Sequence, residues 1–130
     1  MVTKWDGFTG YPYFFGISSA GNGVSFSRYD NFYGMVPKLE YTQDITNQWH
    51  HIVGVKDGGT LNLYVDGIRV ATGTDTTTLN TSNSNPLYLG SLGNTNPRFR
   101  GQIDDLRIYN YALTPQQVKY VMNDGTAKFQ

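Results

Sequence analysis

The sequence predicts an all-β protein, an antiparallel jelly-roll β-sandwich that ends in one short C-terminal helix. Two observations lead to this prediction. Segments of alternating apolar and polar residues follow one another along the chain and are separated by turns rich in Gly. The composition agrees, because Gly, Thr, Asn and Ser account for 47 of the 130 residues and favour turns and strands over helices. We expect residues 1–130 to form a single domain.

The N-terminal part of the chain is predicted to form a meander of short strands. Turns at residues 6–7 and 21–23 separate the first three strands, at positions where Gly permits a positive φ. Two further strands are expected near the C-terminus, after a polar loop over residues 75–85. Outside the central region, the expected strands cover residues 2–5, 11–18, 24–29, 38–42, 86–91 and 102–110.

The clearest pattern lies in the central region, residues 49–74, where three strands follow one another. Residues 57–59 turn the chain between the first two strands. Asp66-Gly67 is predicted to form a type I′ turn between the second and the third. The residues that share a strand face are Trp49, His51, Val53 and Val55, then Leu61, Leu63 and Val65, then Ile68, Val70 and Thr72.

One helix closes the chain. Thr114 is its predicted N-cap, Pro115 its first residue, and Gln117 completes a capping box with Thr114. Gly125 is the expected stop signal. The apolar stripe of this helix consists of Val118, Val121 and Met122.

The charge balance excludes one broad class of partner. The chain has 10 Lys and Arg against 10 Asp and Glu, so no basic excess attracts it to nucleic acid or to an anionic membrane. The absence of Cys excludes disulfides and thiolate metal sites. No apolar run approaches the ~20 residues of a membrane span, and residues 1–20 lack the basic-then-apolar pattern of a signal peptide.

Several motifs resemble one known family. Residues 49–67, WHHIVGVKDGGTLNLYVDG, are similar to the central hairpin of concanavalin A-like, laminin-G-type jelly-roll domains. Leu89-Gly90, the segment FRGQIDDLRIYN over residues 99–110, and ALT at residues 112–114 agree with the same family. The resemblance implies the fold, whereas the family includes lectins, carbohydrate-binding modules, adhesion domains, phage components and some glycosidases.

The resemblance also implies an open edge. Domains of this family open with a strand that pairs with the last one, and residues 2–5 here look like the family's third strand. We therefore expect that the opening strands are not in this chain, and that the strand over residues 102–110 needs a cover. Its apolar residues alternate onto both faces. A second copy in a homo-oligomer, or a strand from a partner or an N-terminal segment, would supply that cover.

Two loops are the candidate ligand-binding sites. Sugars are held by aromatic faces, with Asn, Asp and Arg hydrogen-bonding to their hydroxyls. The alternative is that the aromatic residues fold over the sandwich edge or pack in an interface. The residues expected to bind are Tyr29, Asp30, Asn31, Phe32 and Tyr33 in the first loop, and Asn94, Asn96 and Arg98 in the second.

Acids and histidines offer little for catalysis. Asp104 and Asp105 would point to opposite faces of a strand, so they do not form a glycosidase pair. Asp104 matches an acid that binds structural calcium in some family members, although a hydrogen-bonded Asp without metal is the favoured interpretation. His51 matches an inward, hydrogen-bonded family position and is interpreted as structural, whereas His50 is expected to face away and to be inert.

The leading hypothesis is a non-catalytic carbohydrate-binding, lectin-like or adhesion module that recognises a glycan or polysaccharide. The alternative is a structural assembly subunit, such as a virion or appendage component, in which the same surfaces contact other proteins. Both place the protein outside the cell, on a cell surface or on a virion. An enzyme is not expected, because no nucleophile–base pair or acid pair is evident.

Overall fold

The computed structural model describes residues 1–4, 11–18, 21–30, 34–77, 82–92 and 95–124. In that part the chain forms short strands followed by one helix. The strands are β1 (Val2–Thr3), β2 (Tyr11–Ile17), β3 (Val24–Asp30), β4 (Gly34–Tyr41), β5 (Ile52–Asp57), β6 (Thr60–Val65), β7 (Ile68–Thr74), β8 (Tyr88–Leu89), β9 (Ser91–Leu92) and β10 (Thr95–Arg98), and the helix is α1 (Pro115–Asp124).

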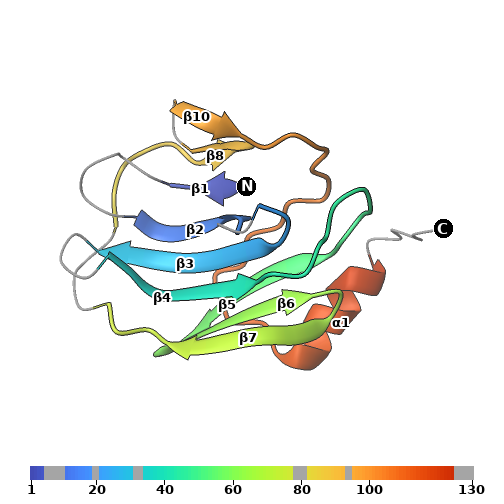
Figure 1. Cartoon of the computed structure of the whole chain (residues 1–130). Helices are drawn as coiled ribbons and strands as arrows, with labels where there is room; N and C mark the ends of the chain where they lie inside the picture. Colours follow the sequence, from blue (N-terminus) through green and yellow to red (C-terminus); the bar gives the residue numbers. More distant parts are fainter. Residues whose placement is uncertain (5–10, 19–20, 31–33, 78–81, 93–94, 125–130) are drawn as a thin grey trace.

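Two antiparallel sheets face each other and make the sandwich (Figure 1). The larger sheet has the strand order β4-β3-β2-β1-β8, and the smaller has the order β5-β6-β7. β9 and β10 pair with each other near β8, and α1 covers the outer face of the smaller sheet (Figure 1). The predicted antiparallel β-sandwich with a short C-terminal helix is confirmed.

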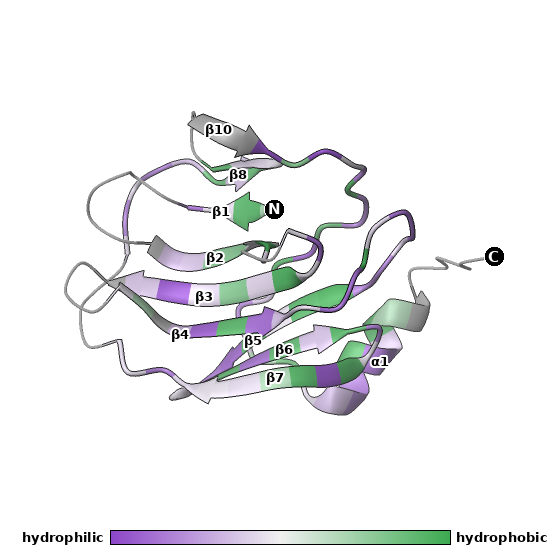
Figure 2. Cartoon of the chain, viewed as in Figure 1, coloured by the Kyte–Doolittle hydropathy of each residue, from purple (hydrophilic) through white to green (hydrophobic). Residues whose placement is uncertain are grey.

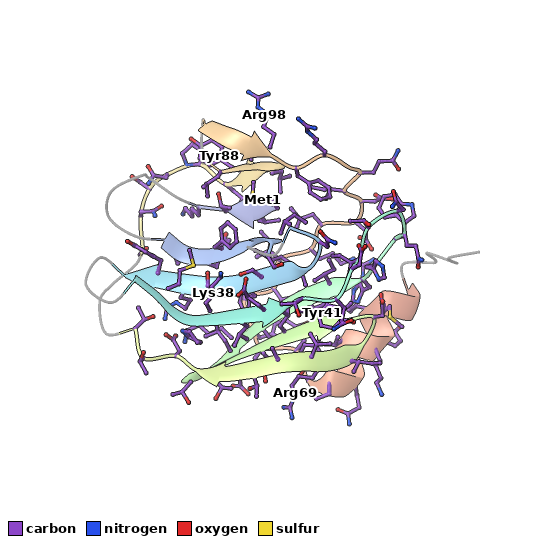
Figure 3. The ribbon with its side chains drawn as sticks, viewed as in Figure 1. Met1, Lys38, Tyr41, Arg69, Tyr88 and Arg98 are labelled. Atoms are coloured by element: carbon purple, nitrogen blue, oxygen red, sulfur yellow. The ribbon has the colours of Figure 1, made fainter. Side chains whose placement is uncertain are left out.

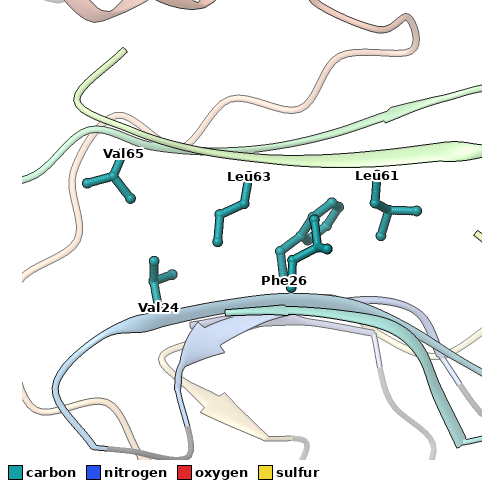
Figure 4. Packing of buried hydrophobic residues seen from close by; sticks show 6 residues of the cluster. Val24, Phe26, Leu61, Leu63 and Val65 are labelled. Atoms are coloured by element: carbon teal, nitrogen blue, oxygen red, sulfur yellow. The ribbon is translucent and has the colours of Figure 1, made fainter. Parts of the chain in front are cut away.

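The main core lies between the two sheets. In Figure 4, the side chains of β6 point toward Val24 and Phe26 of β3. The rings of Phe15 and Phe26 meet edge to face, with their centroids 5.7 Å apart. Every second residue of β6 faces this core, as the alternation in the sequence predicts. The buried members of the core are Val24, Phe26, Leu39, Leu61, Leu63 and Val65.

A second apolar cluster lies on the outer face of the smaller sheet, beneath α1. Val55 of β5 and Tyr64 of β6 are buried there against Leu113 and Val118. Figure 2 shows hydrophobic residues on both sheets and on α1. β6 therefore buries side chains on both faces, which is typical of a strand with a nearly continuous apolar sequence.

The local turn and cap predictions are confirmed. Asp66 and Gly67 have φ of 51° and 75°, the two positive values that a type I′ turn requires. At the start of α1, the Gln117 N–H donates to Thr114 Oγ1 over 3.2 Å. The Thr114 N–H donates in turn to Gln117 Oε1 over 2.8 Å. Both hydrogen bonds of the predicted capping box are present.

The strand predicted over residues 102–110 is wrong. This segment forms no ladder with any described strand, and Asp105 interrupts it with a φ of 51°. It runs from the β9–β10 ribbon to α1 past the outer face of the smaller sheet (Figure 1). A strand needs a neighbour to pair with, and this segment pairs with none of the edge strands β4, β5, β7 and β8, although each has one unpaired edge in the described sheets.

Smaller differences concern strand boundaries. β4 begins at Gly34, earlier than the expected strand over residues 38–42. The strand expected over residues 86–91 is interrupted at Gly90, whose φ is 73°, so β8 and β9 belong to different sheets. β10 lies in the polar loop expected after them. Three expected features lie outside the described residues: the end of the first strand at Trp5, the turn at residues 6–7 and the stop at Gly125.

Candidate functional site

The first candidate loop connects β3 and β4. Asp30 of β3 pairs with Gly34 of β4, and Tyr29 pairs with Met35, so the strands are in register up to the loop. Gly34 has a φ of 75°, and a Cβ built there would lie 3.9 Å from Cε2 of Tyr29. The half-buried Tyr29 ring therefore lies against the Gly34 backbone.

Much of this candidate site lies outside the part that the structure describes. Asn31, Phe32 and Tyr33 are outside it, as is the side chain of Asp30. The chain between the paired residues Asp30 and Gly34 consists of these three residues. Their role as ligand-binding residues stays a prediction.

The second candidate loop lies at the opposite edge of the larger sheet. Arg98 pairs with Ser91 in the β9–β10 ribbon, and its exposed side chain points away from the body of the molecule (Figure 3). Asn94 and the side chain of Asn96 lie outside the described part. Three strand spacings, about 14 Å, separate β3 from β8. The structure therefore does not join the two loops into one compact site, and only an extended ligand reaches both.

Asp104 does not fit a calcium site among the described residues. Its side chain is exposed, and its Oδ1 accepts the N–H of Asp105 over 2.8 Å. No group of three or more His, Asp or Glu side chains gathers around an ion position in the described ranges. Calcium takes six to eight oxygens, and one exposed carboxylate supplies few of them.

The backbone N–H of His51 is hydrogen-bonded, and Nδ1 of its ring is buried. The His51 N–H donates to Asp66 Oδ1 over 3.0 Å, and His50 Nδ1 lies 2.7 Å from Asp66 Oδ2. Asp66 therefore connects its turn to the start of β5, a role beyond the turn alone. The hydrogen bond expected at the His51 ring is not found at Nδ1, which is buried without a partner among the described residues.

Burial lowers the pKa of His51. The nearby carboxylates of Asp66 and Asp105 raise this pKa, Arg107 lowers it, and the pKa lies below its ordinary value. The unfolded chain therefore takes up a proton at a higher pH than the folded chain does. Stability falls as the pH drops below about 6.5, with a slope of at most ~1.4 kcal/mol per pH unit for one proton.

We expect His51→Gln to remove this part of the pH dependence. Urea unfolding of the wild type between pH 7 and pH 5 measures the slope, and the variant should show a flatter profile over the same range. The control is Gln48→Ala, which changes an exposed residue of the same segment that does not titrate, and should keep the wild-type slope. Equal slopes for His51→Gln and the wild type would contradict the assignment to His51.

A buried ion-pair cluster links the two sheets. The Asp75 side chain is only 3% exposed; its Oδ2 lies 2.5 Å from Nη1 of Arg28 and 3.5 Å from Nζ of Lys56. Arg28 on β3 also donates from Nε to the Pro12 carbonyl over 3.1 Å. Sequence reasoning placed Asp75 in a polar loop and missed the cluster, although an Arg within an apolar strand pattern was a signal for it. The arrangement is a structural clamp.

The described residues contain no helix that is both long and apolar enough to cross a membrane. None of the curated proteins compared with this sequence matches it. One crystal structure that matches contains residues 221–444 of an S-layer domain-containing protein from Clostridium thermocellum, with 24% identity and a TM-score of 0.51. The match covers 90% of this chain and 64% of that one, so this chain spans less than two thirds of its length.

A family model agrees with the fold. The model described as the concanavalin A-like lectin/glucanases superfamily matches residues 2–119, which include both sheets and the first half of α1. The match extends beyond the central hairpin to the segment that forms no ladder. The chain belongs to the concanavalin A-like lectin/glucanases superfamily.

Proposed function

We propose that this chain is a non-catalytic carbohydrate-binding or adhesion module that works outside the cell, on a cell surface or on a virion. The observation that carries the proposal is the β3–β4 hairpin, whose paired ends enclose the sequence Asn-Phe-Tyr. The chain that carries this hairpin belongs to the concanavalin A-like lectin/glucanases superfamily. Aromatic and amide side chains together suit the apolar faces and hydroxyls of sugars. The S-layer description of the similar structure supports a surface location.

The positions of the two candidate loops favour an extended ligand. Tyr29 at one edge of the larger sheet and Arg98 near the other are too far apart for one monosaccharide. A polysaccharide chain lying across the ends of the strands could contact both loops. Several weak contacts along one polysaccharide chain together give a higher avidity than any one of them alone.

Replacing Phe32 or Tyr33 by Ala should weaken retention on a responsive polysaccharide about two- to tenfold without changing the melting temperature. One stacked aromatic ring contributes ~0.5–1.5 kcal/mol beyond its buried area, which corresponds to that range. A glycan array identifies the polysaccharide, and affinity electrophoresis measures the retention of each variant.

The control is Tyr120→Ala, which removes a 67% exposed aromatic ring from α1, away from both loops. This variant should bind as the wild type does. If the Phe32 and Tyr33 variants unfold, or bind with unchanged affinity, the loop is structural and the proposed site is wrong.

One observation favours a second candidate function, a structural assembly subunit. Ile103, Leu106 and Ile108 are exposed within one short segment, and such a group is typical of a protein contact surface. A glycan array with no positive signal, together with assembly in solution, would favour this function over carbohydrate binding.

A further inference from the structure

The segment over residues 102–110 combines exposed apolar side chains with unpaired backbone. Ile103, Leu106 and Ile108 are 44%, 43% and 65% exposed. Within the described part of the chain, no backbone N–H or C=O of this segment is hydrogen-bonded to another backbone group. Such groups are the usual requirement for adding a strand from another chain. Figure 2 shows hydrophobic and hydrophilic residues alternating along this connection.

The segment is anchored at its C-terminal end only. Tyr109 packs against the apolar cluster of Val55 and Tyr64, and Ala112 and Leu113 follow it there. The residues before Tyr109 are all exposed. Their sequence is nevertheless that of a strand with apolar groups on both faces, which indicates a partner rather than solvent.

The sequence of the segment is complementary to itself, and this identifies the partner. In an antiparallel pair of two copies centred on Leu106, Asp105 of each copy lies opposite Arg107 of the other. Leu106 then lies opposite Leu106, Ile103 lies opposite Tyr109, and Asp104 lies opposite Ile108. We propose that two copies of this chain form a two-fold dimer by pairing their 102–110 segments in this register.

Charge selects this register over its neighbours. Centring the pair on Asp105 places the two Asp105 carboxylates opposite each other, and centring it on Arg107 does the same to the two guanidinium groups. Like charges directly opposite in a ladder are destabilising. Of these three registers, only the one centred on Leu106 gives two opposite-charge pairs, and a two-fold axis through Leu106 closes the assembly at two copies.

Pairing changes the backbone at Asp105. This residue has a φ of 51° and must adopt extended backbone, which is sterically allowed for every L-residue. In the single chain, Nε of Arg107 donates to Asp105 Oδ1 over 2.8 Å, and the two side chains are 37% and 51% exposed. The dimer exchanges the two solvated pairs, one within each chain, for two pairs between chains.

A disulfide across the proposed axis tests the register. The chain has no Cys, so Leu106→Cys introduces the only thiol. Residues directly opposite in an antiparallel pair have Cα atoms about 4.5–5.5 Å apart, within the range of a disulfide. In air, we expect this variant to convert to a covalent dimer on a non-reducing gel.

The matched control is Ile108→Cys, an apolar position in the same segment that is more exposed than Leu106, at 65% against 43%. In the proposed register the two copies of residue 108 are offset by four residues, about 14 Å along the strands, and do not react. Equal crosslinking at positions 106 and 108, or none at 106, overturns the register.

Charge reversal tests the pairing without Cys. Asp105→Arg and Arg107→Asp each place like charges opposite each other in a dimer of the variant, and we expect each to raise the dissociation constant at least tenfold. Mixing the two variants restores both opposite-charge pairs, because each copy supplies one sign. The mixture should therefore dimerise, as should the double variant Asp105→Arg/Arg107→Asp.

Sedimentation or light scattering at micromolar concentration reads out each sample against the 14.6 kDa mass of one chain. A wild-type mass of twice that value, lost in each single variant and regained in the mixture, supports the proposal. A monomeric wild type overturns it, as does a dimer whose mass in solution is unchanged by both charge reversals. Circular dichroism shows that these variants of exposed residues remain folded.

Discussion

Replacing Asp75 by Ala is expected to lower the free energy of unfolding by ~3–5 kcal/mol, the usual cost of removing one partner from a buried ion pair. Arg28 is only 16% exposed and would lose the carboxylate oxygen that lies 2.5 Å from its Nη1. The Asp75 carboxylate also accepts the backbone N–H of Thr77 over 3.0 Å, and that donor would lose its partner. Equilibrium unfolding in urea measures the change.

A double-mutant cycle separates the ion pair from the packing of the two side chains. Arg28→Ala should cost about as much as Asp75→Ala, and the double variant should cost clearly less than the two together, because the Arg28–Asp75 contact is then lost only once. Lys56→Ala is the control: this Lys is 43% exposed at 3.5 Å, and its loss should cost at most ~1 kcal/mol. Additive effects of the Arg28 and Asp75 substitutions would contradict the proposed clamp.

The loss of unfolding free energy at acid pH tests the same cluster. Burial raises the pKa of Asp75, but hydrogen bonds from Thr77 and Arg28 together lower it by more, so the pKa lies below its ordinary value. The unfolded chain therefore binds the proton first, and the stability from Asp75 is present above about pH 4 and is lost at lower pH. Asp75→Asn should lack this part of the acid dependence.

Local rules explain why the central hairpins were predictable. The alternation over residues 61–65 and the Asp66-Gly67 turn depend on neighbours in sequence, and each signal specifies the same register as the next. The capping box of Thr114 and Gln117 is equally local. In these regions the hydrophobic pattern, the turn residues and the burial agree, so the local sequence is enough to specify the hairpins and the helix start.

Contacts between distant segments explain what the sequence did not reveal. The Arg28–Asp75 pair joins residues 47 positions apart, and no local pattern encodes it. The 102–110 segment has the alternation of a strand, yet alternation does not specify which strand the segment pairs with, and it pairs with none of the described ones. For the candidate binding loops, residue type alone suggested the chemistry, while the order of strands separated Tyr29 from Arg98.

Close approach of two backbone segments makes Gly23 the most restricted glycine among the described residues. A Cβ built at Gly23 would lie 1.8 Å from the carbonyl oxygen of Tyr41 and 3.0 Å from Cα of Thr42. This contact lies where β3 begins and β4 has just ended, beside the hydrogen bond from the Ile45 N–H to the Asn22 carbonyl. A backbone oxygen cannot rotate away as a side chain can, so the strands themselves would have to separate.

Gly23→Ala is therefore expected to lose ~3 kcal/mol or more of unfolding free energy, at or above the upper end of the range for overpacked cores. The control is Gly59→Ala, because a Cβ at Gly59 meets nothing within 4 Å and its backbone needs no positive φ. That substitution adds the same methyl group and the same loss of freedom in the unfolded chain, and should leave stability unchanged or raise it by up to ~1 kcal/mol. Thermal and urea unfolding of the two variants give the comparison directly. Equal stabilities would mean that β3 and β4 approach each other less closely than the 1.8 Å contact requires.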